Sequence, residues 1–427
     1  MTSSRPFEYQ DDLLTCDGVG LGKLAEEFGT PLYVYSANQI LERATLFQNA
    51  LAAEAHTVCY AVKANSSLAI LRLLANAGCG FDIVSGGELA RVITAAGYEA
   101  ASRVVFSGVG KSASEMDAAL AADILLFNVE SESELHLLAS RAETAGKRAR
   151  VALRVNPDVS AETHPYISTG LSAHKFGIAI AQAFEVYQKA ASMPSLDVAG
   201  VSVHIGSQIR QVAPFAEALS RTLTLVGNLK EAGHNIRYID VGGGLGIEYG
   251  ASPFYAAEQV EAYAASLRSA LQGARRLGMN LHVLLEPGRF IVAQAGCLLT
   301  RVLVRKRNGD KQFVIADAAM NDLIRPALYQ AHHEIVPVRL QPDAVMEVAD
   351  IVGPVCESGD FFARDRSLAV TQEGDLLAIL DAGAYGLSLS SNYNTRLRPA
   401  EVLVEQGRPR PIRRRETYED LFAQEMP

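Results

Sequence analysis

Eight short apolar segments, separated by helical patterns, constrain the fold of this chain more than any other feature. Each segment is rich in Val, Ile, Leu or Phe, and its apolar residues are consecutive rather than alternating. Strands buried on both faces have this pattern, as in parallel sheets that helices cover. The segments are 57–62, 80–84, 103–106, 123–127, 150–155, 198–204, 236–241 and 281–285. Eight β-α units in about 250 residues predict an α/β fold, a (β/α)8 barrel of the TIM type.

The sequence after residue 290 has a different texture, with short β-type runs between turn sequences such as Asn308-Gly309-Asp310. The expected strands cover 296–306, 312–316, 333–338, 345–352, 376–380 and 402–405. This pattern predicts an all-β C-terminal domain, an antiparallel sandwich or small barrel. The first 35 residues also contain strand-like pieces. We therefore expect a barrel domain at 36–290 and a β domain formed by 1–35 and 291–427.

Composition limits the classes of function. The chain has 427 residues, of which 49% are hydrophobic, enough for the cores of two domains. Its net charge of -9 argues against nucleic-acid binding, and the cationic run 408–415 is short enough to be a solvated tail or a surface strand.

The N-terminus lacks the pattern of a signal peptide, and no apolar run is long enough to span a bilayer. Five cysteines without paired spacing predict neither disulfides nor a zinc site. We expect a cytoplasmic protein that binds no membrane.

Polar or glycine residues follow every predicted barrel strand, at the end where the active sites of such barrels form. Lys63 follows the first strand, His204 ends the sixth and Glu286 follows the eighth. Partial burial favours a neutral lysine amine, which Schiff-base chemistry requires. His204 could stack on a flat cofactor ring, or be an ordinary core histidine.

The seventh strand runs into Gly242-Gly243-Gly244, which differs from the dinucleotide-binding fingerprint. Glycines let backbone N–H groups approach an anion, and phosphate sites in barrels commonly follow strands seven and eight. A plain tight turn is the alternative. Glu286 could keep a pyridine nitrogen protonated or pair with Arg289, whose forked donors also suit phosphate or carboxylate.

The C-terminal domain adds two further candidate segments, Cys356-Glu357-Ser358-Gly359-Asp360 and Ala382-Gly383-Ala384-Tyr385. Acidic neighbours favour a protonated Cys356 thiol, which suits a proton donor better than a nucleophile. The His332-His333-Glu334 sequence resembles a metal site, but adjacent strand residues point to opposite faces. We expect no metal ion.

Taken in order, these motifs resemble the diaminopimelate decarboxylase family, one of the fold-type III pyridoxal-phosphate decarboxylases, which also include ornithine and arginine decarboxylases. The resemblance extends from about Thr30 to Phe422. The matching segments are Tyr60-Ala61-Val62-Lys63-Ala64-Asn65, His174-Lys175-Phe176-Gly177, His204-Ile205-Gly206-Ser207-Gln208, Gly242-Gly243-Gly244, Glu286-Pro287-Gly288-Arg289, Met320-Asn321-Asp322-Leu323-Ile324-Arg325-Pro326, Cys356-Glu357-Ser358-Gly359-Asp360 and Ala382-Gly383-Ala384-Tyr385.

The resemblance implies a cofactor, pyridoxal 5'-phosphate, bound as a Schiff base to Lys63, and decarboxylation of meso-2,6-diaminopimelate to L-lysine. His204 would stack on the ring and Glu286 would pair with its nitrogen. The implied cofactor-binding residues are Lys63, Asp82, His204, Ser207, Gly242, Gly243, Gly244, Glu286, Gly288, Arg289 and Tyr385. The implied substrate-binding residues are Arg289, Arg325, Tyr329, Glu357 and Tyr385. Catalysis would fall to Lys63, His204 and Cys356, with Cys356 protonating the substrate carbon.

The resemblance also implies a homodimer with shared active sites, because in the family the Cys356-Glu357 segment comes from the partner subunit. Decarboxylation of another basic amino acid or of a carboxy-polyamine is the main alternative. Glu357 argues against it, since ornithine-type members tend to have Asp there. An amino-acid racemase would need a tyrosine base where this chain has Cys356. A non-catalytic binding protein is a further alternative, although the catalytic positions are all intact.

Overall fold

The computed structural model describes residues 5–159, 175–250 and 252–426, so His174 of the expected motif lies outside it. The chain divides into two compact units. We call residues 43–247 and 255–290 the barrel unit, and residues 1–42, 248–254 and 291–427 the β unit.

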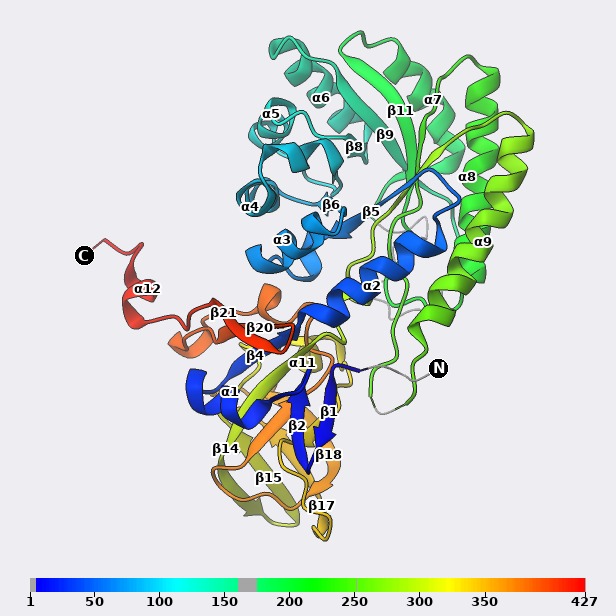
Figure 1. Cartoon of the computed structure of the whole chain (residues 1–427). Coiled ribbons are helices and arrows are strands. Elements are labelled where there is room, and N and C mark those ends of the chain that lie inside the picture. The colour runs from blue at the N-terminus through cyan, green and yellow to red at the C-terminus, as the bar shows by residue number, and fades with distance from the viewer. Residues whose placement is uncertain (1–4, 160–174, 251, 427) are drawn as a thin grey trace. The chain divides into compact units, whose positions relative to one another are not determined.

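The barrel unit contains a closed ring of eight parallel strands, shown with its helices in Figure 1. The ring closes because the last strand pairs with the first, Val283 opposite His56. The strands are β5 (His56–Ala61), β6 (Gly80–Ile83), β7 (Val104–Phe106), β8 (Leu126–Val129), β9 (Ala149–Asn156), β11 (Leu196–Val203), β12 (Tyr238–Asp240) and β13 (His282–Leu285). These are the eight predicted segments, so the expected (β/α)8 barrel is confirmed.

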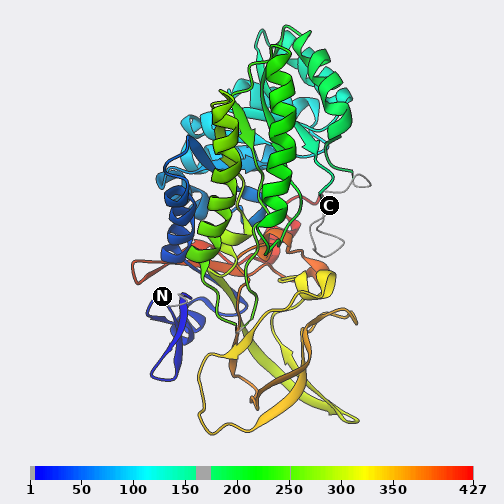
Figure 2. The ribbon, with the colours of Figure 1, turned by 90° about the vertical axis from the view of Figure 1, so that its right-hand side faces the viewer.

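Helices follow the barrel strands and cover the outside of the ring. They are α3 (Leu68–Asn76), α4 (Gly86–Ala96), α5 (Ala113–Ala121), α6 (Glu132–Thr144), α7 (Ile180–Ala191), α8 (Ala213–Glu231) and α9 (Ala256–Arg276). The two longest, α8 and α9, run side by side in both views (Figure 2). A short strand, β10 (Ile178–Ala179), pairs with β9.

Three successive helices begin at a serine that is followed three residues later by glutamate. The side chains of Ser85, Ser112 and Ser131 accept hydrogen bonds from the backbone N–H groups of Glu88, Glu115 and Glu134. Such caps satisfy N–H groups that have no partner within the helix, and so fix where α4, α5 and α6 begin.

The β unit is built around one connected sheet, in which β14 (Gly296–Asn308) is the longest strand. Its other strands are β4 (Leu32–Ser36), β15 (Lys311–Ala316), β16 (Ile335–Pro337), β17 (Met346–Val352), β18 (Phe361–Ala369), β19 (Leu376–Ile379), β20 (Ala400–Glu405) and β21 (Arg408–Arg413). A small separate sheet holds β1 (Phe7–Gln10), β2 (Leu13–Cys16) and β3 (Val19–Gly20). The remaining α-helices are α1 (Leu21–Phe28), α2 (Ala37–Ala50), α10 (Arg289–Val292), α11 (Arg325–Tyr329) and α12 (Tyr418–Phe422).

The β-rich C-terminal region is confirmed, but the expected antiparallel arrangement is wrong at two pairings. β15 runs parallel to β17, and β20 runs parallel to β4. The parallel partner of β20 comes from the N-terminal segment, where strand-like pieces were expected to join this domain. The cationic run forms β21, an exposed strand at the end of the sheet. Its two prolines are tolerated there because an edge strand needs fewer backbone donors.

Within the described residues, no helix is both long and apolar enough to cross a bilayer.

Candidate functional site

Lys63 lies in a short 3-10 turn (Val62–Ala64) directly after β5, and its side chain is 37% exposed. Its Nζ is 2.6 Å from Oδ2 of Asp82, a fully buried carboxylate on β6. The parallel register of β5 and β6 pairs Ala61 with Asp82, which brings the lysine and the carboxylate to the same end of the barrel. The partly exposed amine can therefore react with a ligand while remaining oriented by Asp82.

Glu286 follows β13 and is buried at the same strand ends. Its Oε1 accepts a hydrogen bond from Ser107 Oγ at 3.1 Å, and Asn128 Nδ2 lies 3.5 Å away. Asn128 also donates to Asp240 Oδ2 at 2.6 Å. Burial, reinforced by the nearby carboxylates of Asp240 and Asp82, raises the pKa of Glu286 well above its usual value. Glu286 was an expected site residue, and Asn128 is the polar residue that follows the fourth predicted strand, whereas Asp240 lies inside the seventh predicted segment and was not expected in the site.

The glycine run after β12 contacts the interior of the barrel directly. The N–H of Gly242 donates to Asp240 Oδ1 at 2.9 Å, and the N–H of Gly243 donates to His204 Nδ1 at 3.1 Å. Burial, with the positive charges of Arg154 and Lys63, lowers the pKa of His204 well below its usual value. The imidazole is therefore neutral, with Nδ1 accepting and the proton on Nε2.

Two residues expected near a phosphate are in contact: Arg289 Nη2 donates to Ser207 Oγ at 3.1 Å. The neighbouring Gly288 packs tightly, since a Cβ there would lie 3.0 Å from the Cβ atoms of Ala61 and Ala64. The turn between Glu286 and Arg289 thus lies against the segment that carries Lys63.

Arg154 on β9 adds a buried cation to this end of the barrel. Its Nη1 donates to Glu130 Oε1 at 2.9 Å, and its guanidinium lies 5.0 Å from the centre of the Phe176 ring. Gly177 donates its N–H to the other oxygen of Glu130 at 3.2 Å. The described part of the 174–177 motif therefore helps to position Arg154.

This end of the barrel fits pyridoxal 5'-phosphate. Among the described residues, the buried Oδ1 of Asp82 has no hydrogen-bond partner, and three buried carboxyl groups face only a few cations. Such a cluster is suited to a ligand that carries positive charge, such as a protonated pyridine ring. Lys63 supplies the amine, and the contact between Ser207 and Arg289 supplies donors for an anion.

The remaining expected residues lie in the β unit. Arg325 begins α11 and is buried, with Nη1 2.8 Å from His333 Nε2. The Arg325 guanidinium also lies 4.7 Å from the centre of the Tyr249 ring. His333 Nδ1 is 2.8 Å from the carbonyl oxygen of Leu380, so the imidazole orients Arg325. Tyr329, at the end of the same helix, is half-buried.

The second β-unit group contains Cys356, Glu357 and Tyr385. Cys356 and Glu357 are exposed, in a loop pinned by Asp360, whose carboxylate accepts from the N–H groups of Met320 and Val355, each at 2.7 Å. Tyr385 has a φ of 55°, a left-handed conformation that a bulky side chain rarely adopts. Strain of this kind is typical of residues that the surrounding structure holds for a functional reason.

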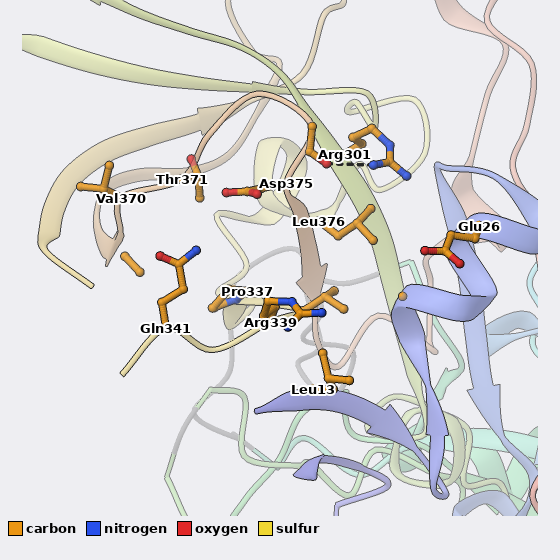
Figure 3. A pocket seen from close by; sticks show the side chains of 14 residues that line it. Leu13, Glu26, Arg301, Pro337, Arg339, Gln341, Val370, Thr371, Asp375 and Leu376 are labelled. Carbon is orange, nitrogen blue, oxygen red and sulfur yellow. Dashed lines mark hydrogen bonds between the residues drawn. The ribbon is translucent and has the colours of Figure 1, made fainter. Parts of the chain in front are cut away.

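The β unit also contains a cavity of about 250 Å³, shown in Figure 3. Arg301, Arg339, Gln341 and Thr371 are among its lining side chains, which mix charged, polar and apolar groups. Within the described part of the chain, this lining includes none of the expected site residues.

Comparisons with known proteins agree with this chemistry. Residues 37–293 match the family described as "Pyridoxal-dependent decarboxylase, pyridoxal binding domain". A diaminopimelate decarboxylase from Pseudomonas aeruginosa is 52% identical over 420 residues, which cover 98% of each chain.

Two solved structures resemble the whole chain. Diaminopimelate decarboxylase from M. jannaschii, in complex with L-lysine, has a TM-score of 0.93 at 39% identity, covering 100% of this chain and 99% of its own. The Helicobacter pylori enzyme, also complexed with L-lysine, has a TM-score of 0.89 at 41% identity, with 95% and 99% covered. On sequence and on structure, the chain belongs to the diaminopimelate decarboxylase family of pyridoxal-dependent decarboxylases.

Proposed function

We propose that this chain catalyses the pyridoxal-phosphate-dependent decarboxylation of meso-2,6-diaminopimelate to L-lysine and carbon dioxide, the last step of lysine biosynthesis. The observation that carries the proposal is the close similarity, over nearly the whole chain, to decarboxylases of this name whose structures hold L-lysine. L-lysine is the product that loss of one carboxylate from diaminopimelate leaves.

When bound, pyridoxal phosphate supplies an electron sink for the pair of electrons that the departing carboxylate leaves behind. Lys63 would hold the cofactor covalently, and Asp82 orients the lysine amine for that bond through their 2.6 Å contact. Glu286 holds the pyridine nitrogen. His204, kept neutral by burial, packs on the ring without adding a positive charge beside it.

The phosphate is held at the turns after β11, β12 and β13, by Ser207, by the Gly242-Gly243-Gly244 run and by the turn containing Gly288 and Arg289. The N–H groups of Gly242 and Gly243 already donate to Asp240 and His204. The role of these two glycines is therefore close approach of the backbone, and the charged donor is Arg289.

Arg289 of the barrel unit and several residues of the β unit bind the substrate and finish the reaction. Arg289 and Arg325 bind the distal carboxylate, and Glu357 binds the distal amino group, with Tyr329 and Tyr385 as further substrate-binding residues. Cys356 then donates its proton to the substrate carbon that has lost its carboxylate. His333 supports this arrangement because it contacts the Arg325 guanidinium at 2.8 Å.

The working protein is a cytoplasmic homodimer in which Cys356 and Glu357 complete the active site of the partner subunit. Both residues are exposed in this chain, which supports that role. Residues 36–290 then form the cofactor-binding domain. Residues 1–35 and 291–427 form the domain that contributes to the active site and to the dimer interface.

The test is incubation of the purified protein with pyridoxal phosphate and meso-diaminopimelate, with chromatographic measurement of lysine and of released carbon dioxide. Lysine and carbon dioxide are expected in equal amounts. Parallel incubations contain ornithine, arginine or lysine in place of diaminopimelate. Turnover of one of these without turnover of diaminopimelate would assign a different substrate, and a change of chirality without carbon dioxide would indicate a racemase.

A further inference from the structure

A buried polar network lies behind Glu286 and connects four barrel strands. Asn128 on β8 donates to Asp240 on β12 at 2.6 Å and lies 3.1 Å from Ser107 Oγ, just beyond β7. Ser202 on β11 donates to the same Asp240 oxygen at 3.3 Å. Asn128 and Asp240 are fully buried, so these contacts exclude water. A buried polar network of this kind is costly unless its members are well satisfied.

Two of its members are carboxyl groups, Asp240 and Glu286, and Asn128 Nδ2 contacts both, at 2.6 Å from Asp240 Oδ2 and 3.5 Å from Glu286 Oε1. Burial and the Asp240 charge raise the pKa of Glu286. Burial also raises the pKa of Asp240, although hydrogen bonds from Gly242 and Asn128 oppose the shift.

The charged and titratable groups that face this pair come from three other elements. Asp82 on β6 adds a third carboxylate, while the Cys59 thiol on β5 and the Tyr263 phenol on α9 have pKa values that burial raises, so both stay neutral. Lys63 is the cation that acts on Glu286, and it is already paired with Asp82. Around Glu286, buried carboxyl groups therefore outnumber the cation that acts on them.

We propose that Asp240 is a positioning residue for the cofactor, which acts through Glu286 by supplying a second negative charge behind it. The proposal rests on the proposed function, because its ligand is the pyridine nitrogen of pyridoxal phosphate. A protonated ring nitrogen held at Glu286 would be stabilised by the charge of Asp240 as well as by that of Glu286.

A purely structural role for Asp240, tying β8 to β12, makes a different prediction from an electrostatic one. If Asp240 only held the strands together, its removal would destabilise the protein with or without the cofactor. If Asp240 supplies charge, the cofactor-free protein gains from its removal, because a repulsion between buried acids disappears. Only the complex with the cofactor then loses stability.

The experiment uses the full-length Asp240→Asn variant, which keeps the shape of the side chain and removes the charge. Pyridoxal-phosphate Kd is measured by equilibrium dialysis, and urea unfolding of the cofactor-free protein is measured at about pH 8. We expect a Kd raised about tenfold or more, as for loss of about one pK unit of interaction. We also expect cofactor-free stability equal to or above that of the unsubstituted protein.

Two further variants keep the result interpretable. Asn128→Ala removes a donor from both carboxyls but keeps both charges, so it should lower cofactor-free stability while leaving the Kd within about threefold. Asp17→Asn, in the β unit, removes another carboxyl whose pKa burial raises, at a φ of 47° that Asn tolerates, and should leave the Kd unchanged.

An unchanged Kd for Asp240→Asn, or a Kd loss that follows a parallel loss of cofactor-free stability, would overturn the inference. If Asp240→Asn does not fold, Asp240→Ser, which removes the charge but keeps an oxygen that can accept a hydrogen bond, is measured in the same way and judged by the same two outcomes. Failure of the unsubstituted protein to bind pyridoxal phosphate would instead remove the proposed function itself.

Discussion

Glu88 and Glu115 occupy the same capping position on neighbouring helices, yet their surroundings shift their pKa values in opposite directions. Burial raises the pKa of Glu88 from 4.5 to about 7, despite a hydrogen bond from the N–H of Val84. Hydrogen bonds from Gly86 and Ser112 lower the pKa of Glu115. The two glutamates have the same position within their helices, so the difference between their pKa values comes from their surroundings alone.

The raised pKa of Glu88 should make the stability of the folded protein fall as the pH rises. The folded protein retains the Glu88 proton up to about pH 7, whereas the unfolded chain releases it near pH 4.5. The stabilising contribution is thus complete below about pH 4.5 and is lost as the pH rises to about 7. Glu88→Gln keeps the acceptor for Val84 and removes the titration. The variant should exceed the unsubstituted protein in stability at about pH 8 by on the order of 1 kcal/mol.

The measurement is urea unfolding of the cofactor-free protein between about pH 5 and pH 8. Glu115→Gln is the matched control, with the opposite sign. Its lowered pKa gives stability that is present at neutral pH and is lost only as the solution becomes acidic. Glu115→Gln should therefore be less stable at neutral pH, and a pH profile of Glu88→Gln parallel to that of the unsubstituted protein would contradict the assignment.

At the scale of secondary-structure elements, the turn after β12 brings two strand ends unusually close together. A Cβ on Gly243 would lie 2.1 Å from the carbonyl oxygen of Glu286, well inside van der Waals contact. The next glycine, Gly244, has a φ of 103°, which side chains rarely adopt. The glycine run therefore lets the residues after β12 and β13 share one site.

Gly243→Ala should force these two strand ends apart. We expect the free energy of unfolding to fall by about 2–3 kcal/mol and cofactor affinity to fall with it. Gly273→Ala is the matched control, because Gly273 lies within α9 with no atom within 4 Å of its added Cβ. That helix substitution should raise stability by about 0.5–1 kcal/mol. Chemical unfolding and cofactor titration measure both, and a Gly243→Ala protein with unchanged values would refute the close-approach role.

At the scale of the whole molecule, the proposed sharing of active sites between subunits has a quantitative consequence. Lys63→Ala and Cys356→Ala each disable every site of their own homodimer. In a mixed dimer, one site combines an intact Lys63 with an intact Cys356. Random association of equal amounts should therefore restore about a quarter of the sites in the whole mixture, and about half of the sites in the purified mixed dimers. Co-expression with two different tags, followed by purification on both and assay of lysine formation, measures the recovery.

The control pairs Lys63→Ala with Glu286→Gln, two barrel residues from the same half of the proposed site. Neither site of that mixed dimer is intact, so no activity should return. No activity in the Lys63→Ala and Cys356→Ala mixture would place each active site within one chain. Activity in the control would instead show that Lys63 and Glu286 of one site come from different chains.

The barrel could be predicted because its strands are buried on both faces, which leaves a local mark in the sequence. Two features of the β unit could not be predicted in this way. β18 was missed because Arg364, Asp365 and Arg366 interrupt its apolar pattern. The parallel pairing of β4 with β20 was missed because strand direction depends on which distant segment lies alongside. Periodicity indicates which faces of a strand are buried, but it carries no information on which other strand pairs with it.

The same limit determines which residues of the site could be found from the sequence. Lys63, His204 and Glu286 could be found from sequence, because reactive or charged residues directly after apolar strands are conspicuous, and the family motifs assign their roles. Asp240 could not, because within a short apolar run it looks like an ordinary strand residue, and Asn128 could be placed only as the polar residue that follows the fourth strand. Only closure of the barrel brings β8, β12 and the end of β13 together, so that Asn128 contacts both Asp240 and Glu286. The raised pKa values of these two carboxyl groups follow from that enclosure, since burial and mutual distance are properties of the folded chain.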